Sequence, residues 1–457
     1  MTPDAKSQIF AIKRGMINSR LNVNYYQPKY QSNIEKLKNA NNGRLHKISD
    51  FANVVCGPFG SAIKNGDYLP SGIPLLRITN ISNDGVLNYR DLKFISKKLS
   101  EKLHNTQVSS GDIVISQRGS LGLCAIVDDR YKTLNISANL IAIKNIKGHS
   151  SEFIKNYINT NICKDFLDKA QSGQIQSKIN TSDISEILVP FGLDEYKLNR
   201  IISEKYEKYI LKKRQADELL AGMDEFVLNK LSIQISPVRN LLCWPISIDT
   251  LESANSFNPE YFHPERLSII NAIRNSDLPF FALKRKVVFK RDLVDKKNVA
   301  TTFLGLASVQ SNIGERIDSD EEAFGGAFKY TVGDVLYCRL RPYLNKVFLA
   351  EEDGICSTEF YVMHPLDDSI LSEYLAVIMR SKLILLQTKH MMTGNTHPRI
   401  SNDDVKDLVI PLPDIKAQRQ IAEEYQKRTQ KARQLRQEAE REWQNAREQF
   451  EKELLGE

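Results

Sequence analysis

Hydrophobic and polar positions along the chain follow two kinds of pattern. Short runs of β-branched and other apolar residues are bounded by Gly, Pro, Asn and Asp, as in residues 110–115, where Ser-Gly-Asp precedes Ile-Val-Ile. Such runs are typical of short strands joined by turns. Two long stretches without proline, residues 194–233 and 414–455, are instead rich in helix formers. The pattern predicts an α+β protein in which two regions of strands and short helices are each followed by a long helix.

Both long stretches carry an apolar residue at every seventh position, which places those residues on one face of a helix. Neither face buries enough apolar surface to stabilise an isolated helix. Two arrangements would bury these apolar faces: the helices pair with each other, or each packs on its own domain. We favour pairing as an antiparallel coiled coil. The expected pairing positions are Ile202, Tyr209, Ala216 and Met223 in the first helix, and Tyr425, Ala432, Leu435, Ala439 and Ala446 in the second.

The chain also repeats itself once. Residues 173–190 align without a gap with residues 394–411, and a glycine, a basic residue, an isoleucine, an aspartate and the final proline coincide. Shorter matches in the same order join 110–115 to 332–337 and 22–28 to 258–264. Three matches in register indicate two diverged copies of one domain.

The repeat and the long helices together predict the domain boundaries. They are an N-terminal segment at 1–20, a first domain at 21–192, a first long helix at 193–235, a second domain at 236–412 and a second long helix at 413–457.

Composition narrows the class of protein. The chain of 457 residues is 41% hydrophobic and 26% charged, as in soluble globular proteins of several domains. No apolar run approaches the ~20 residues of a membrane-spanning helix, and the N-terminus is polar, so we expect a cytoplasmic protein. The net charge is +7, and because charges balance in residues 414–457, the positive surplus lies upstream of the last helix. A basic surplus permits a nucleic-acid partner.

Signatures of chemistry are missing. The six cysteines form no Cys-x-x-Cys pair, so neither a zinc site nor a disulfide framework is expected. No phosphate-binding loop and no hydrolase or metalloprotease motif is present. Asn258-Pro-Glu-Tyr261 resembles the base-gripping loop of adenine methyltransferases but has Glu260 in place of a proline. Pro413-Asp-Ile-Lys416 resembles part of a nuclease motif, yet Asp414 is better interpreted as a helix N-cap. We expect no catalytic and no metal-binding residues.

Side chains suited to DNA recur at equivalent places of the two copies. Arg77 and Thr79 alternate along an expected strand, so they lie on one side of it. Arg, Asn and Gln can reach base edges, but Arg and Lys contact phosphates more often, so the sequence leaves open which atoms they bind, and a solvated surface role also remains open. The candidates are Ser61, Lys64, Arg77, Thr79, Asn80, Gln117, Arg118, Gln174, Gln176 and Lys178 in the first copy, and Arg339, Arg341, Asn345, Lys346, Asn395, His397 and Arg399 in the second.

The assembled pattern resembles the specificity subunit of type I restriction-modification systems over nearly the whole chain. The resemblance is carried by Phe-Gly-Ser-Ala-Ile-Lys at 59–64, Pro-Leu-Leu-Arg-Ile-Thr-Asn at 74–80, Gly-Asp-Ile-Val at 111–114, and the strands that end at Pro190 and Pro413 before a helix. It implies two target recognition domains, each reading half of a split DNA sequence. Helices of about 38 to 42 residues extend roughly 57 to 63 Å, which exceeds the about 34 Å of one DNA turn, so they would set the spacer between the halves.

The resemblance also implies partners. They are double-stranded DNA, two adenine-methylating subunits and, in a phage-defence complex, translocase-nuclease subunits; S-adenosylmethionine, ATP and magnesium would belong to the partner subunits, and this chain would bind no cofactor. The second copy departs from the pattern, because Thr-Phe-Leu-Gly-Leu-Ala-Ser at 302–308 replaces the strand with Arg77. The two halves should therefore read different sequences. Two alternatives stay open: a self-contained DNA methyltransferase or nuclease, and a coiled-coil scaffold that binds no DNA.

Overall fold

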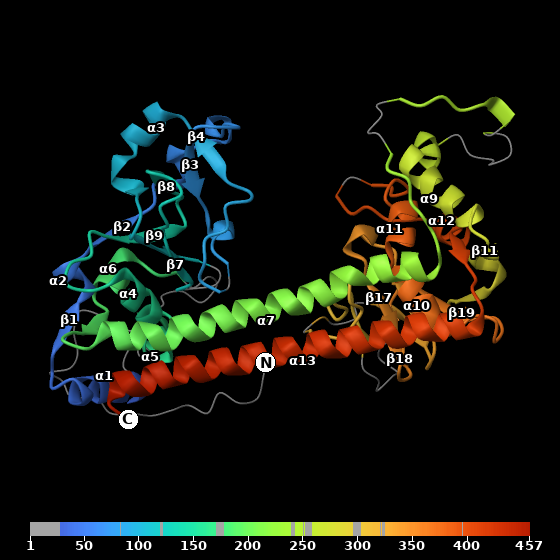
Figure 1. Ribbon diagram of the computed structural model, residues 1–457. Coiled ribbons are helices and arrows are strands. Elements are labelled where there is room, and N and C mark those ends of the chain that lie inside the picture. The colour runs from blue at the N-terminus through green and yellow to red at the C-terminus, as the bar shows by residue number, and fades with distance from the viewer. Residues whose placement is uncertain are drawn as a thin grey trace. The chain divides into compact units, whose positions relative to one another are not determined.

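The computed structural model describes residues 28–82, 84–118, 122–170, 178–238, 243–249, 251, 258–295, 303–319, 321, 325–394 and 396–457. The chain divides into two compact units (Figure 1). The first comprises residues 1–210 and 439–457, and the second comprises residues 211–438. Each unit therefore holds one α+β domain together with one part of each long helix.

The first domain is built on two four-stranded sheets. The first has the order β2-β9-β6-β7 and is antiparallel throughout, and the second has the order β4-β3-β8-β5, in which β3 and β8 are parallel. A separate antiparallel pair joins β1 to β10. The strands are β1 (Leu45–Lys47), β2 (Asn53–Cys56), β3 (Ile73–Leu76), β4 (Lys93–Ile95), β5 (Gln107–Val108), β6 (Ile113–Ser116), β7 (Cys124–Ile126), β8 (Leu134–Ile136), β9 (Leu140–Lys144) and β10 (Leu188–Pro190).

Short helices surround these sheets. Ser150 caps helix α4 by accepting a hydrogen bond from the Phe153 amide, as expected of a serine N-cap. The α-helices are α1 (Pro28–Ala40), α2 (Ile48–Phe51), α3 (Lys97–Lys102), α4 (Ser151–Ile158), α5 (Asn161–Ala170) and α6 (Thr181–Ser185), and 3-10 helices span η3 (Gly60–Ala62), η4 (Asn65–Asp67), η5 (Ile78–Asn80) and η6 (His104–Thr106).

Strand β6 lies at the centre of the first domain. Ile113 and Ile115 belong to the hydrophobic core under helices α4 and α5, whereas Val114 between them belongs to the core on the opposite face, and all three are fully buried. A strand buried on both faces needs apolar residues without alternation. This explains why the turn at residues 110–112 leads into an unbroken apolar run.

The second domain repeats the first sheet. Its strands take the order β12-β19-β16-β17, again antiparallel, and a second sheet has the order β13-β15-β18-β14, in which β14 and β18 are parallel. The strands are β11 (Phe280–Ala282), β12 (Val287–Lys290), β13 (Leu293–Asp295), β14 (Phe303–Leu304), β15 (Gly326–Tyr330), β16 (Val335–Cys338), β17 (Val347–Leu349), β18 (Gly354–Ser357), β19 (Phe360–Pro365) and β20 (Val409–Pro411), with β11 paired to β20.

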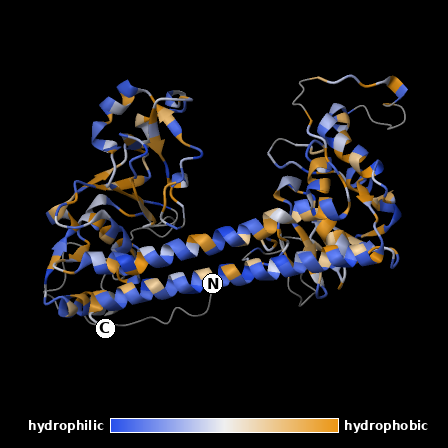
Figure 2. Ribbon diagram, in the orientation of Figure 1, coloured by the Kyte–Doolittle hydropathy of each residue, from blue (hydrophilic) through white to orange (hydrophobic). Residues whose placement is uncertain are grey.

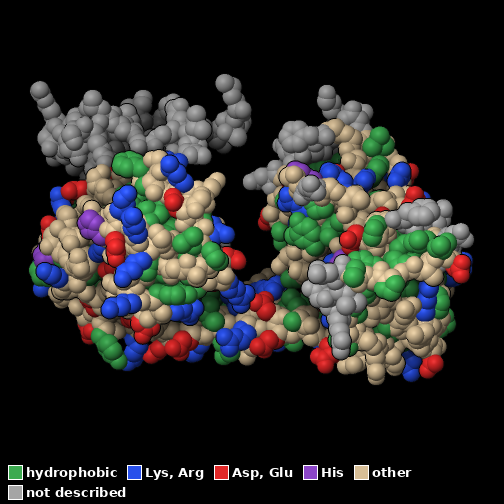
Figure 3. Space-filling view, turned by 90° about the horizontal axis from the view of Figure 1, so that it is seen from above, with side chains coloured by type: hydrophobic (Ala, Val, Ile, Leu, Met, Phe, Trp, Pro, Cys, Tyr) green, Lys and Arg blue, Asp and Glu red, His purple; other side chains and the backbone are tan. Residues whose placement is uncertain are grey.

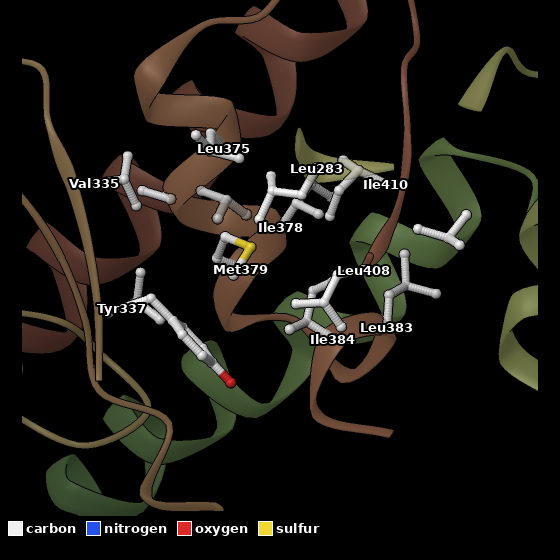
Figure 4. Packing of buried hydrophobic residues seen from close by; sticks show 14 of the residues in the cluster. Leu283, Val335, Tyr337, Leu375, Ile378, Met379, Leu383, Ile384, Leu408 and Ile410 are labelled. Carbon is white, nitrogen blue, oxygen red and sulfur yellow. The ribbon is translucent and has the colours of Figure 1, made fainter. Parts of the chain in front are cut away.

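Helices α10 and α11 fill the core of the second domain. Figure 4 shows Leu375, Ile378 and Met379 of α10 between Val335 of β16 on one side and Ile410 of β20 on the other. The helices of this domain are η7 (Pro259–Phe262), α9 (Pro264–Arg274), η8 (Leu283–Arg285), η10 (Pro342–Leu344), α10 (Ser372–Arg380), α11 (Lys382–Thr388) and α12 (Asn402–Lys406).

The two domains differ in where the fourth strand of their second sheet lies. In the first domain β4 extends the sheet beside β3, which is the strand parallel to β8. In the second domain β13 extends it at the opposite edge, beside β15. The three shared strands therefore form a common framework, and the edges have diverged.

The same turn introduces the central strand of each domain. Gly111 has a φ of +89° and Gly333 a φ of +83°, a region that favours glycine. The aspartate that follows each glycine folds back, so that Asp112 accepts a hydrogen bond from the Ser109 amide at 2.9 Å and Asp334 accepts one from the Thr331 amide at 2.8 Å. The Gly-Asp pairs of the sequence repeat are thus a structural turn.

Two long helices follow the domains, as predicted. They are α7 (Glu195–Lys230) and α13 (Ile415–Leu455). Asp194 accepts a hydrogen bond from the Lys197 amide at 3.0 Å, and Asp414 accepts one from the Ala417 amide at 2.7 Å. Asp414 is therefore an N-cap, which confirms the structural interpretation of that motif. Figure 2 shows that both helices are mostly hydrophilic, in contrast to the strands of the domains.

In the first unit the start of α7 pairs with the end of α13. The Trp443 ring lies between Tyr206 and Tyr209, with ring centroids 5.3 and 5.7 Å away. Lys197 forms an ion pair with Glu453 at 2.8 Å. Since the beginning of one helix contacts the end of the other, they run antiparallel.

In the second unit the end of α7 pairs with the start of α13. Asp217 binds Arg436 at 2.7 Å, and the Arg428 guanidinium lies 5.3 Å from the centre of the Phe226 ring. The predicted antiparallel pairing is confirmed. The fully or nearly buried pairing residues are Ile202, Tyr209, Ala216, Met223, Ala432, Ala439 and Ala446, while Tyr425 and Leu435 are half-buried.

The helices also pack on their own domains. Ile202 and Phe450 belong to the core of the first domain, and Met223 and Ile421 belong to that of the second. Pairing with each other and packing on a domain are therefore combined rather than exclusive.

Candidate nucleic-acid interface

In the first domain, the ends of several strands meet at one set of loops. The Gln117 amide, just after β6, donates to the Asn139 carbonyl at 2.9 Å, and the Ile179 amide donates to the Gln117 carbonyl at 3.2 Å. The Gly57 amide, just after β2, donates to the Leu140 carbonyl at 2.8 Å. These bonds bring together three segments that contain predicted DNA-binding residues, around residues 57–64, 117–118 and 178. They meet at one end of the strands of the first sheet.

The expected strand through Arg77 and Thr79 is wrong, because β3 ends at Leu76 and the 3-10 helix η5 follows over Ile78–Asn80. The end of β3 nevertheless lies beside the same loops. The Ser137 amide donates to the Leu76 carbonyl at 2.9 Å, so the end of β3 adjoins the turn that begins β9. Arg77 follows directly and is half-buried, and its Nη2 donates to the Asp91 carbonyl at 3.0 Å. A cation held in this way presents its remaining N–H groups from a fixed position. The exposed candidates of this domain are Ser61, Lys64, Thr79 and Arg118, and Lys178 is half-buried.

Two candidates of the first domain serve the fold. Asn80 is 1% exposed, its Oδ1 accepts from the Arg77 amide at 2.9 Å and its Nδ2 donates to the Asn88 carbonyl at 3.0 Å. Gln117 is 3% exposed, and its Nε2 lies 3.6 Å from the sulfur of Cys56. Both side chains are directed inward, so the structure gives them positioning roles. Gln174 and Gln176 lie outside the described residues.

The second domain builds its loops on the same backbone bonds. The Arg339 amide donates to the Glu359 carbonyl at 2.9 Å, and the Ile400 amide donates to the Arg339 carbonyl at 3.1 Å. The Arg341 amide donates to the Pro398 carbonyl at 2.7 Å. Arg339 and Glu359 thus take the places of Gln117 and Asn139 in the first domain.

An ion pair dominates this second set of loops. The Arg399 Nη2 lies 2.7 Å from Glu359 Oε1, and the Arg399 Nε lies 3.0 and 3.1 Å from the two carboxylate oxygens. These hydrogen bonds raise the pKa of Arg399. The Arg339 Nε is 3.9 Å from the same carboxylate, and its guanidinium lies 5.6 Å from the centre of the Tyr361 ring.

Arg341 stands in an unusual backbone conformation. Its φ is +49°, a left-handed conformation that few residues other than glycine adopt. Such strain is often stored where function requires it. The side chain is half-buried, and its Nη2 lies 3.4 Å from the Thr396 carbonyl. Nearby His397 is exposed.

Asn345 and Lys346 have internal partners. Asn345 is 3% exposed, and its Nδ2 donates to the Arg380 carbonyl at 2.8 Å. The Lys346 ammonium donates to the Leu306 carbonyl at 2.6 Å. The structure gives Asn345 a positioning role, and Lys346 is tied to its own domain. Asn395 lies outside the described residues.

Sequence reasoning missed Asn139 and Glu359. Each directly precedes the strand that pairs with β6 or β16, and each backbone carbonyl receives the amide of a candidate residue. A carboxylate does not suggest a polyanionic ligand when charges are considered one by one. The signal that could have identified them is their position in the fold. Asn139 follows β8 and Glu359 follows β18, and these two strands occupy the same place in the two domains.

Charged side chains of both signs are mixed on one face of the molecule (Figure 3). In the view of Figure 3, Lys and Arg side chains are scattered among acidic and neutral ones on the described atoms of that face. The second domain also holds a group of side chains suited to a metal ion, His263, Glu265 and His390, with ligand atoms within 4.8 Å of one another. Glu265 is already paired with Lys389 at 2.7 Å and with His390 at 2.8 Å, and the two imidazole rings are stacked. This group links the start of α9 to the segment after α11, and His390 lies nine residues before Arg399 of the loops described above.

Two copies of one framework, carrying different polar side chains at matching loops, define a protein with two similar but non-identical domains. The family model for the type I restriction modification DNA specificity domain matches residues 45–219 and 280–440. These regions cover well over half of the chain, and the chain belongs to this family. The resemblance drawn from the motifs is thereby confirmed.

One relative with a similar sequence is a protein of the same kind. The type I restriction enzyme EcoDI specificity subunit of Escherichia coli is 25% identical over 182 residues, which are 36% of this chain and 39% of that protein. The match thus spans well under half of that relative's length.

Two solved structures align with most of the chain. The S subunit of the type I restriction-modification system of M. genitalium aligns with a TM-score of 0.43 and 12% identity over 90% of this chain and 95% of that one. A chain from a structural study of complex assembly and conformational transition of the type I R-M system aligns with a TM-score of 0.42 and 15% identity over 90% of this chain and 96% of that one.

The helices of the described residues include none with the length and apolar character that a membrane span requires.

Proposed function

We propose that this chain reads a two-part DNA sequence and directs partner enzymes to it. The observation that carries the proposal is the pair of equivalent loop sets, in which identical backbone bonds hold Gln117 and Asn139 in one domain and Arg339 and Glu359 in the other. A shared framework with different side chains suits two readers of unlike sequence, because base edges are distinguished by the pattern of donors and acceptors they meet.

The long helices supply the spacer in this proposal. A helix of 41 residues, the length of α13, extends about 62 Å at ~1.5 Å per residue, which is longer than a DNA turn of about 34 Å. Half-sites read by domains on such helices would be separated by a fixed number of base pairs.

The partners in the proposal are two adenine methyltransferase subunits and, in the restricting complex, translocase-nuclease subunits. S-adenosylmethionine, ATP and magnesium would be bound by those subunits, and the chain itself would act as a non-catalytic subunit on cytoplasmic DNA. The mostly polar surfaces of α7 and α13 are the extended surfaces available for such assembly.

Mapping methylated adenines in the host genome, with and without this gene, tests the proposal. We expect one motif with two fixed halves and a constant spacer, and we expect its loss when the gene is deleted. A genome without any motif that depends on the gene would contradict the proposal.

The purified chain provides a second test. Incubated alone with DNA and S-adenosylmethionine, it should transfer no methyl groups; transfer would favour a self-contained methyltransferase. Assembled with its methyltransferase partner, it should bind DNA that carries the motif and slow its migration in a gel-shift titration. An assembled complex without DNA affinity would favour a protein-only scaffold.

A further inference from the structure

We propose that Arg399, held by Glu359, reads a guanine in the half-site of the second domain. The inference rests on the proposed function and adds a base and a pair of residues to it. The sequence leaves open whether a given arginine binds a phosphate or a base.

The ion pair leaves one edge of the arginine available. Glu359 occupies the side of the guanidinium formed by Nε and Nη2, at 2.7 to 3.1 Å. At the other end of the guanidinium are Nη1 and the second N–H of Nη2. Among the described residues, the contact made there besides that of Glu359 is the long 3.4 Å one between Nη1 and the His397 carbonyl. Two parallel N–H groups at this end match the O6 and N7 acceptors of guanine, which arginine binds in bidentate fashion.

The arginine is also held in place. Its backbone forms a two-way bridge with Thr393, with both N–H to O distances at 2.9 Å, and it pairs with Leu340 on the other side. The Arg399 side chain is 40% exposed, and that of Glu359 is 25% exposed. A long side chain that is fixed before binding loses less conformational freedom on contact with a base.

Charge argues for a base rather than a phosphate. Phosphate contacts depend on net positive charge and on the release of counterions. Glu359 offsets one of the two positive charges that Arg399 and Arg339 bring to its carboxylate, and it would itself be repelled by a nearby phosphate. The pair retains directional donors while losing part of its attraction for the backbone, which are the properties that a base contact requires.

The two matching positions of the first domain carry different residues. Ile179 and Ile400 occupy equivalent places, since each donates to the residue that follows the central strand, so Lys178 corresponds to Arg399. Asn139, a neutral residue, corresponds to Glu359. Lys178 therefore has neither a planar fork nor a carboxylate partner at that place, and the guanine contact is expected in the second half-site alone.

The test uses the chain assembled with its methyltransferase partner and maps methylated adenines in cells. Arg399→Ala should abolish the requirement for guanine at one position of the second half-site, raising methylation of sites with other bases there by roughly 10- to 100-fold relative to the native motif. Arg399→Lys should do the same, since lysine keeps the charge and loses the fork. Glu359→Gln should relax the same position less.

Controls separate the possible failures. Lys178→Ala should leave the second half-site unchanged, and thermal melting of each variant checks that the second domain is folded. Equal loss of methylation at all sites with Arg399→Ala, restored by Arg399→Lys, would identify a phosphate contact and overturn the inference, as would an unchanged motif in both variants. Absence of any two-part motif with the unsubstituted chain would instead overturn the proposed function.

Discussion

Arg77 and Gly305 occupy the same place in the two domains and differ in charge. Each follows the strand that runs parallel to β8 or β18, and each amide donates to the side chain three residues on, Asn80 at 2.9 Å or Ser308 at 3.2 Å. The Arg77 side chain reaches the Asp91 carbonyl, whereas a side-chain atom built on Gly305 would meet the Glu321 carboxylate. The first domain thus has a cation at this place of the shared framework, and the second has a glycine beside a carboxylate.

Arg77→Ala should therefore affect only the first half-site. If Arg77 reads a base, its loss costs about 1–3 kcal/mol of discrimination at one position of that half. Methylome mapping with the variant complex would show relaxation there and an unchanged second half. A uniform drop over both halves, with a shallower salt dependence, would make Arg77 a phosphate contact.

The aspartates of the two Gly-Asp turns differ in their surroundings. The Asp334 side chain is completely buried and binds the Lys290 ammonium at 2.8 Å and His364 Nδ1 at 2.7 Å, in addition to the Thr331 amide. The Asp112 carboxylate accepts hydrogen bonds from the amide and the hydroxyl of Ser109.

Asp334→Ala should destabilise its domain more than Asp112→Ala does. Both substitutions remove the turn hydrogen bond, at a cost of about 1–3 kcal/mol. Asp334→Ala also removes the contacts with Lys290 and His364, whose side chains are 25% and 42% exposed. Urea unfolding of the two variants, followed by circular dichroism, measures the difference. Equal midpoints would show that Lys290 and His364 contribute little to the second domain.

At the scale of elements, the helix pair depends on small residues. Ala432, Ala439 and Ala446 are at most 2% exposed, so the face of α13 that carries them is covered by neighbouring parts of its unit. Alanine at such positions lets two helix backbones approach closely, and close packing leaves no room for a larger side chain. Ion pairs between the helices, such as Asp217 with Arg436, are partly exposed and add little stability.

Ala432→Leu should loosen the pairing within the second unit. Overpacking a closely packed position costs about 1–3 kcal/mol, although leucine is a good helix former. Thermal melting of the full chain would show a lower transition temperature. Ala221→Leu, at an exposed position of α7, is the matched control and should leave melting unchanged. A similar decrease in both variants would point to helix propensity or solubility rather than packing.

At the scale of the whole molecule, duplication produces two domains whose shared parts are structural. Both domains have the Gly-Asp turn and the four-stranded antiparallel sheet. Both also have the hydrogen bond that the backbone amide of Ile179 or Ile400 donates. The parts that differ are the fourth strand of the second sheet and the side chains of the loops. A common framework can therefore change its ligand without changing its fold.

If the long helices set the spacer, lengthening both should widen it. Seven added residues in each of α7 and α13 preserve the seven-residue stripe and extend the pair by about 10 Å. With about 3.4 Å per base pair, the spacer should grow by about three base pairs while both half-sites stay the same. Methylome mapping measures the spacer directly, and an unchanged spacer would show that the helices do not set it.

Local patterns in the sequence were enough to predict the class of fold. Periodicity located both long helices and their pairing face, and the repeat located two domains with equivalent loops. Solvent exposure of single polar residues was harder to predict. Asn80, Gln117 and Asn345 have the chemistry of DNA-contacting side chains, yet each is buried and bonded within its domain. A short polar residue at a strand end can cap the backbone or face the solvent, and its own identity does not distinguish the two.

The sequence by itself determined the duplication, the two helices and the family, because these depend on spacing and on residue types that recur along the chain. Only the tertiary structure brought Glu359 to Arg399, since 40 residues of chain separate them and the backbone bonds between β16, β19 and the loop before α12 close that distance. That contact decides which edge of the arginine faces outward. A contact of this kind depends on how distant segments of the chain are placed in space. The spacing of residues along the sequence does not determine that placement.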